Sequence, residues 1–234
     1  LIQWNLRPKD RIACITTSAI LLTLLPIIRY GRMAMLDGTQ LSAIALLWLC
    51  LSSIKKNRST KFNFLGAGFA CSFMLLLKAP VIIPALFASL LPLIWEYKSK
   101  KYSNNLSWSW FFYGVFPGFA WHLWNIFSYG KGAFWLWWGD GAGRVLFEKG
   151  SGSELGVLVP IIEIFEGGWP WILVWPIGFL WACFSLNTRW GVWAFSTQII
   201  IAGSILPLKM QLPWYIHPFW LPFALVCGPP VSWL

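Results

Sequence analysis

The residues whose types could carry chemistry are few, and many of them lie in one polar segment between two apolar runs. This segment, residues 128–169, is predicted to be a loop on the outer face of a membrane. Within it, Arg144 follows closely spaced glycines, which let a backbone fold tightly around a ligand. Its guanidinium group offers paired donors that suit phosphate oxygens. The alternative is a solvated charge paired with Asp140 or Glu148, and the residues alone leave both possibilities open.

A second group lies where the first apolar runs would reach the same outer face. Lys78 ends one run, and Pro80 begins the next after a tight turn. The lysine could extend its ammonium group to lipid headgroups, or it could contact a phosphate, and the sequence favours neither. Arg32 and Asp37 are five residues apart, and a structural pair tying two helix ends together is favoured over direct catalysis.

A third group lies among prolines in the last part of the chain, where Lys209, Tyr215 and His217 occur close together. The prolines restrict the backbone and prevent a plain helix start. The segment is therefore expected to present a cation, a phenol and an imidazole at the outer surface. A belt of interfacial aromatic residues would explain Tyr215, but it requires neither Lys209 nor His217.

Two other places carry ionisable groups to which we assign simpler roles. His122 stands alone among aromatic residues, so a hydrogen-bonded position between helices is favoured over catalysis. Glu163 and Glu166 lie in or beside residues 157–165, an apolar run too short to cross a membrane. This run predicts a short interfacial helix under the outer loop, with its acids in water. Binding of a metal or a sugar by these acids is the minority alternative.

Composition indicates which elements must position these residues. The chain of 234 residues is 58% hydrophobic and only 11% charged, whereas soluble domains carry about 25% charged residues. Apolar runs separated by short charged connectors predict an all-α bundle, because backbone polar groups in lipid must be satisfied within each helix. We expect one transmembrane domain, residues 1–234, with about eight crossings, at residues 12–28, 40–54, 64–77, 81–95, 108–127, 171–186, 192–206 and 214–233.

The distribution of charge predicts the orientation of this bundle. With the amino end inside, the inner connectors hold eleven basic and two acidic residues, and the outer connectors hold seven and six. Basic residues concentrate on the cytoplasmic side of membrane proteins, so the outer face carries the mixed charges expected of a site. The inner basic groups have almost no acidic partners and are expected to meet anionic lipid headgroups. The 19 tryptophans are expected in the two interfacial belts.

The same features count against other classes of protein. The net charge of +10 is divided among short loops and forms no continuous face, so no nucleic-acid partner is expected. The five cysteines are scattered without metal-ligand spacing, so neither a disulfide framework nor a metal site is expected. The sequence has no initiator Met and no signal peptide, and we expect it to be part of a longer protein.

The order and spacing of these pieces resemble the polyprenyl-phosphate-dependent membrane glycosyltransferases. That family includes protein O-mannosyltransferases and the lipid A aminoarabinose transferase. No single piece is specific, but together they extend over nearly the whole chain. The matching pieces are Arg32–Gly38, Leu77–Pro80, Trp121-His122 followed by Gly130 and Phe134, Arg144-Val145, Gly168–Trp171, and Lys209–Pro222.

This resemblance implies a glycosyltransferase-C type fold in the plasma (inner) membrane, with its active face outward. The expected reaction moves a sugar from a polyprenyl-phosphate donor to a lipid, glycan or protein acceptor. The resemblance further implies substrate-binding roles, chiefly at the donor phosphate, for Lys78, Arg144, Lys209, Tyr215, His217 and Arg32.

The chain departs from the family pattern at two places that affect the site. The acidic base of relatives lies in a first outer loop, which is expected upstream of Leu1, so Asp37 is only a weak candidate for a catalytic residue. Gly139 occupies the position at which some relatives bind a metal through a histidine, so no metal or other cofactor is expected. The alternative function is a transporter or flippase-like carrier of an anionic lipid-linked substrate. Such a carrier would need an internal repeat or broken helices with charges at mid-depth, and no convincing repeat is seen.

Overall fold

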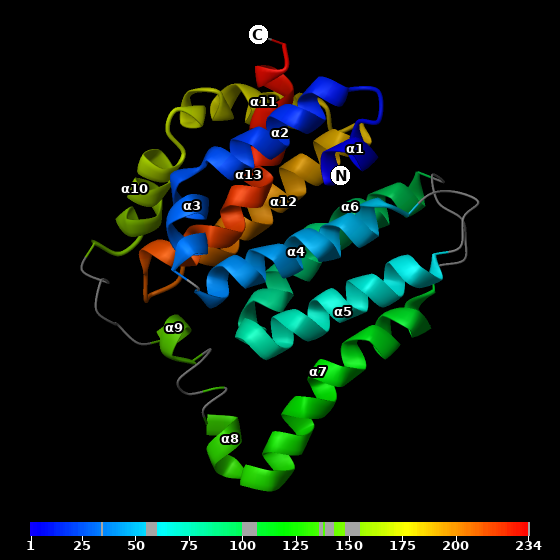
Figure 1. The fold of residues 1–234 in the computed structure, drawn as a ribbon, viewed down its shortest axis with the longest axis vertical. Coiled ribbons are helices and arrows are strands. Elements are labelled where there is room, and N and C mark those ends of the chain that lie inside the picture. Colours follow the sequence, from blue (N-terminus) through cyan, green and yellow to red (C-terminus); the bar gives the residue numbers. More distant parts are fainter. Residues whose placement is uncertain are drawn as a thin grey trace.

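The structure, a computed structural model, describes residues 1–33, 35–54, 60–99, 107–135, 138, 143–147 and 155–233, apart from the side chains of residues 144 and 145. Within these ranges the regular elements are all helical, as Figure 1 shows, so the predicted all-α class is confirmed. In chain order the elements are α1 (Ile2–Leu6), α2 (Arg11–Thr23), α3 (Leu25–Arg32), α4 (Leu36–Ser52), α5 (Lys61–Lys78), η1 (Ala79–Val81), α6 (Ile82–Lys98), α7 (Trp108–Tyr129), α8 (Lys131–Trp135), α9 (Arg144–Phe147), α10 (Leu158–Gly167), η4 (Trp171–Leu173), α11 (Trp175–Phe184), α12 (Arg189–Ile205), η5 (Pro213–Phe219) and α13 (Trp220–Val231).

Helical structure occurs at every predicted crossing, but the predicted number of crossings is not confirmed. Among the described residues, one apolar helical stretch, Lys61–Lys98, is long and apolar enough to cross a membrane. Two bent helix pairs would raise the number to three if each pair is one span. The first pair, α2 and α3, bends by 54°, because Leu24 between the helices is extended and Pro26 lies at the start of α3. The second pair joins α10 to the segment Trp171–Phe184 with a bend of 107°.

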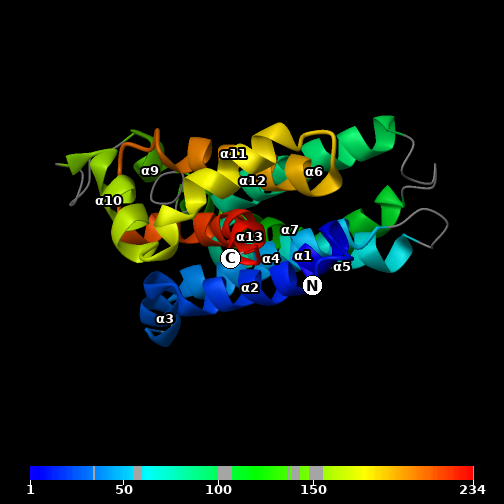
Figure 2. The same cartoon turned by 90° about the horizontal axis from the view of Figure 1, so that it is seen from above.

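The stretch Lys61–Lys98 reverses direction at its middle. Lys78 leaves the helical conformation, with φ −159° and ψ 79°, and the short helix η1 follows it. Figures 1 and 2 show that the start of α5 and the end of α6 lie at the same end of the bundle, with the turn between the two helices at the opposite end. The turn predicted at Lys78 to Pro80 is therefore present. Lys78 lies at the tip of this helical hairpin.

Small residues bring α5 and α7 into close contact. A Cβ atom at Gly114 would lie 2.8 Å from the backbone nitrogen of Phe69, and one at Gly118 would lie 2.8 Å from the carbonyl oxygen of Ser72. The hydroxyl of Ser72 also accepts a hydrogen bond of 2.7 Å from the backbone N–H of Gly118. Closely packed small residues of this kind are typical of helix interfaces in membranes. This interface was not predicted from the sequence.

Several tryptophans lie in the core, which corrects the expectation that they form interfacial belts. Trp48, Trp190 and Trp193 are at most 2% exposed. Each donates its indole N–H to a buried acceptor: Trp48 to the carbonyl of Ala85, Trp190 to that of Leu225, and Trp193 to Glu96. Buried indole N–H groups usually find such a partner, and through these three the tryptophans connect helices inside the bundle.

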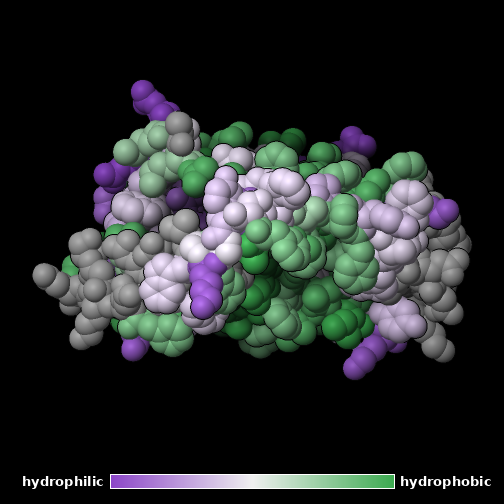
Figure 3. All heavy atoms as spheres, turned by 90° about the horizontal axis from the view of Figure 1, so that it is seen from below, coloured by the Kyte–Doolittle hydropathy of each residue, from purple (hydrophilic) through white to green (hydrophobic). Residues whose placement is uncertain are grey.

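The outside of the molecule is strongly apolar. Along α7, aromatic side chains such as Phe112, Phe116, Trp124 and Phe127 are more than half exposed. Figure 3 shows one face with hydrophobic side chains across its middle and most hydrophilic side chains toward its two ends. An apolar middle between polar ends is the surface expected of helices that contact lipid.

Candidate functional site

One end of the bundle brings together three of the predicted site residues with Asp37. The ammonium nitrogen of Lys78 lies 3.0 Å from the Oδ1 atom of Asp37 and 4.4 Å from the centre of the Tyr215 ring. His217 follows on the same short helix, η5, and interacts electrostatically with both members of the ion pair. We call Asp37, Lys78, Tyr215 and His217 the Lys78 cluster.

Local structure explains how each helix presents its residue to this cluster. Lys78 is the last residue of α5, where the chain reverses. Asp37 lies in the first turn of α4, where the partial positive charge of a helix N-terminus stabilises a carboxylate. One turn later, the side-chain amide of Gln40 donates a hydrogen bond of 3.3 Å to the carbonyl oxygen of Lys78. The start of α4 therefore binds both the side chain and the backbone of Lys78.

The ion pair is only partly removed from solvent. The side chain of Asp37 is 9% exposed, whereas that of Lys78 is 32% exposed. An ammonium group has three N–H donors, of which the hydrogen bond to Asp37 uses one. Its contact with the Tyr215 ring is within the range of cation–π attraction. The ammonium therefore keeps donor capacity on its solvent side, where it could receive an anionic group.

His217 gives the cluster a neutral imidazole. The residue is 1% exposed, its ring lies edge-on to that of Tyr30 at 5.6 Å, and its Nδ1 atom has no hydrogen-bond partner within the described residues. Helix η5 lies outside the candidate membrane spans. Burial lowers the pKa of His217, the carboxylate of Asp37 raises it, and the ammonium of Lys78 lowers it, with a net decrease. Uncharged at neutral pH, the ring can accept a hydrogen bond at one nitrogen and donate one at the other.

Contacts made by Tyr30 and Pro26 connect the region of the cluster to the end of the predicted outer loop. The hydroxyl of Tyr30 on α3 donates a hydrogen bond of 3.3 Å to Glu163 on α10, the short helix predicted in residues 157–165. Gly167, the last residue of α10, packs against the ring of Pro26, which lies one turn before Tyr30. Neither Tyr30 nor Gln40 was predicted from the sequence. Only Gln40 could have been found there, because it lies three residues after Asp37 and so on the same side of one helix.

The other predicted site residues are not joined to this cluster in the described part of the chain. Arg32 and Lys209 are exposed and contribute no ion pair or hydrogen bond to the described cluster. Asp37 pairs with Lys78 instead of the predicted Arg32, because the reversal at Lys78 places its ammonium group beside the first turn of α4. Arg144 begins the short helix α9, but its side chain lies outside the described residues. Asp140 and Glu148 also lie outside them.

A different polar cluster lies at the far ends of the helices and contains Arg189, one of the inner basic residues expected to meet lipid headgroups. Its contacts correct that expectation. Nε of Arg189 lies 2.9 Å from both carboxylate oxygens of Glu96, which is 2% exposed. The guanidinium group also donates to the backbone carbonyls of Asn5 and Ser52 at 3.0 and 2.8 Å. Trp193 donates to Glu96 at 2.7 Å. These contacts tie α1, α4, α6 and α12 together, so the role of this cluster is structural.

His122 also lies where the sequence placed it, between helices. Its Nε2 atom is 2.9 Å from the carbonyl oxygen of Leu75 on α5, and its ring packs edge-on against that of Trp121.

Comparison with known proteins adds no assignment. The chain matches no protein-family model, no curated protein and no solved structure. The residues of the Lys78 cluster therefore provide the basis for a functional proposal.

Proposed function

We propose that the chain is a multi-pass membrane glycosyltransferase that takes a sugar from a polyprenyl-phosphate donor. The proposal rests chiefly on one observation: Lys78 is held by Asp37 and Tyr215, beside the buried His217, at one end of an all-helical apolar bundle. It includes the glycosyltransferase-C type fold, about eight crossings, and an outward-facing site in the inner membrane. The acceptor is a lipid, glycan or protein.

The chemistry of such a transfer explains the need for a positioned cation. When an acceptor hydroxyl displaces phosphate at the anomeric carbon, negative charge develops on the departing phosphate. A lysine that is already held in place stabilises this charge without reorganising. Asp37 and Tyr215 would keep the Lys78 ammonium in position before the donor arrives. Arg144, Lys209 and Arg32 remain proposed further contacts to the substrate, and the base that takes the acceptor proton is not assigned to a residue of this chain.

A transporter or flippase-like carrier of an anionic lipid-linked substrate is the second candidate, and one observation favours it. The two bent helix pairs contact each other, through Tyr30 with Glu163 and through Pro26 with Gly167. Broken helices that meet beside charged groups are typical of transporter substrate sites. The glycosyltransferase remains the first proposal because the resemblance of the motifs extends over nearly the whole sequence.

A single reconstitution experiment separates the two candidates. The full-length protein is placed in lipid vesicles with a radiolabelled polyprenyl-phosphate sugar and a mixture of membrane acceptors. A transferase moves the label to an acceptor, whereas a carrier moves the intact donor across the bilayer.

Variants of Lys78 then test the proposed site. Lys78→Met is expected to lower the rate of transfer by about a hundredfold or more, as for removal of a group that stabilises developing charge. Lys78→Arg, which keeps the charge, is expected to retain part of the rate, and Lys98→Met, at the far end of α6, is expected to retain all of it. Rates are compared per mole of folded protein. An unchanged rate for Lys78→Met would remove this residue from the site.

A further inference from the structure

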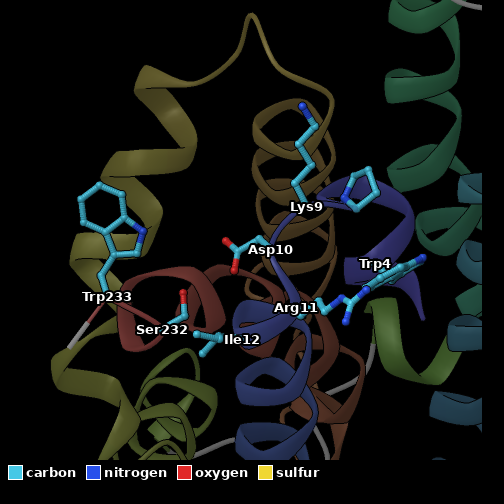
Figure 4. A pocket seen from close by; sticks show the side chains of 8 residues that line it. Trp4, Lys9, Asp10, Arg11, Ile12, Ser232 and Trp233 are labelled. Carbon is cyan, nitrogen blue, oxygen red and sulfur yellow. The ribbon is translucent and has the colours of Figure 1, made fainter.

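A hollow at the amino-terminal end of α2 has a lining that differs from that of the Lys78 cluster. Its volume is about 720 Å³, within the range of small-molecule sites, about 300–1,000 Å³. Figure 4 shows Asp10 near its centre, Ser232 and Trp233 on one side, and Trp4 with Arg11 on the other. Lys9 extends from its rim. The lining comes from both ends of the described chain, because α2 and α13 pack side by side.

Inside this hollow the negative charge of the Asp10 carboxylate is already paired with groups of the protein. Its Oδ1 atom accepts a hydrogen bond of 2.9 Å from the backbone N–H of Ala13, in the first turn of α2. Its Oδ2 atom lies 2.9 Å from a terminal nitrogen of Arg7. Both oxygens are therefore occupied, and Asp10 offers little repulsion to an arriving anion. The positive charges of Lys9 and Arg11 remain without an acidic partner within the described residues.

Tryptophans form the walls on both sides of these charges. The guanidinium carbon of Arg11 lies 5.9 Å from the centre of the Trp4 ring, so the ring restrains the cation. Trp233 is 77% exposed, and its ring packs edge-on against that of Trp181 at 5.2 Å. Exposed indole rings beside lysine and arginine are typical of the region where a bilayer meets water.

We propose that this hollow binds the headgroup of an anionic phospholipid. Lys9 and Arg11 would contact the phosphate, while Trp4 and Trp233 would lie at the level of the glycerol backbone. Basic pockets between helix ends recognise anionic headgroups in this way, and each lysine or arginine near an anionic surface contributes about a fivefold increase in affinity. This site does not depend on the proposed transferase activity.

Binding of short-chain lipids to the purified full-length protein in detergent tests the proposal. Native mass spectrometry counts bound dihexanoyl phosphatidylglycerol and dihexanoyl phosphatidylcholine over a concentration series, with and without inorganic phosphate. We expect saturable binding of one phosphatidylglycerol, with much weaker binding of phosphatidylcholine. Inorganic phosphate is expected not to compete at equal concentration, because it lacks the glycerol and acyl groups that contact the tryptophans.

Variants locate the binding in this hollow. Lys9→Gln with Arg11→Gln is expected to weaken phosphatidylglycerol binding about 25-fold, and Trp233→Ala is expected to weaken it without affecting the fold. The matched control, Lys61→Gln with Lys98→Gln, removes two exposed lysines elsewhere and is expected to bind normally.

Three results would overturn the proposal: equal binding of the two lipids, equal binding by the Lys9/Arg11 and control variants, or displacement of the lipid by equimolar inorganic phosphate. The last result would indicate a site for a soluble anion instead. If the Lys9/Arg11 variant fails to fold, unchanged binding by Trp233→Ala overturns the proposal.

Discussion

Removing either member of the Lys78–Asp37 ion pair is predicted to have unequal effects on stability. Lys78→Met leaves the carboxylate of Asp37, which is 9% exposed, without its cation. Breaking a buried pair in this way costs about 3–5 kcal/mol. Asp37→Asn instead leaves a lysine that is 32% exposed, whose flexible side chain can turn toward solvent. We expect that change to cost about 1 kcal/mol or less, as for a surface pair.

The helix N-terminus at Asp37 reduces the cost of the lysine variant. Asp37 lies in the first turn of α4, where the partial positive charge of the helix end stabilises the carboxylate in part after its cation is lost. We therefore expect Lys78→Met to lose about 2–3 kcal/mol, at or below the lower end of the range for buried pairs.

Equilibrium unfolding of the purified protein in detergent, followed by tryptophan fluorescence, measures these differences. For a chain of this size, a loss of 2–3 kcal/mol lowers the midpoint temperature by about 5–10 °C. The double variant is expected to lose only about 1 kcal/mol, because neither charge is then left alone. Equal losses for the two single variants, or a double variant as unstable as Lys78→Met, would refute this account of the ion pair.

Four other changes test the packing and the titration of the bundle. Gly114→Leu is expected to lose at least about 2 kcal/mol of unfolding free energy, because its side chain meets the backbone of α5. Gly203→Ala adds a methyl group that has no atom of the described residues within 4 Å, and it should gain up to about 1 kcal/mol in the same unfolding assay. Arg189→Lys is expected to lose about 3 kcal/mol or more, because lysine cannot reach Glu96 and the backbone carbonyls together; a midpoint temperature equal to that of the native protein would contradict this. Burial holds the pKa of His217 below 6.5, so its contribution to stability is complete above pH 6.5 and is lost as the pH falls below it. His217→Gln should therefore show a smaller fall in midpoint temperature between pH 7.5 and 5.5, and identical falls would exclude His217 as the cause.

Helix positions were predictable from the sequence because they depend on local patterns. The apolar runs gave the helical segments, and Lys78 followed by Pro80 gave the reversal between α5 and α6. The prolines near Tyr215 and His217 indicated an irregular start to the last helix, which the structure shows as η5. The break at Leu24, inside the crossing predicted at residues 12–28, was missed, because an apolar run has the same composition whether its helix is straight or bent.

The partners of the charged residues were not predictable in the same way. Glu96 and Arg189 are 93 residues apart, and their meeting depends on which helix ends the packing brings together. Hydrophobic periodicity gives the buried face of a helix but not its neighbour. For the same reason the sequence suggested Arg32 as the partner of Asp37, because those two are close along the chain. The contact between Tyr30 and Glu163 could not be predicted either, because the two residues lie on different bent helix pairs.

The close contacts between α5 and α7 make the position of Lys78 depend on the number of residues that separate it from them. Gly68 and Ser72 fix the rotation of α5 about its own axis, because both lie against α7. Lys78 follows six residues after Ser72 on the same helix. A single inserted or deleted residue between Ser72 and Lys78 would swing the lysine by about 100° and shift it by about 1.5 Å along the helix axis. Either change would carry the ammonium away from Asp37. The length of this short stretch is thus under tighter constraint than its apolar composition, and indels there should be far less tolerated than conservative apolar exchanges.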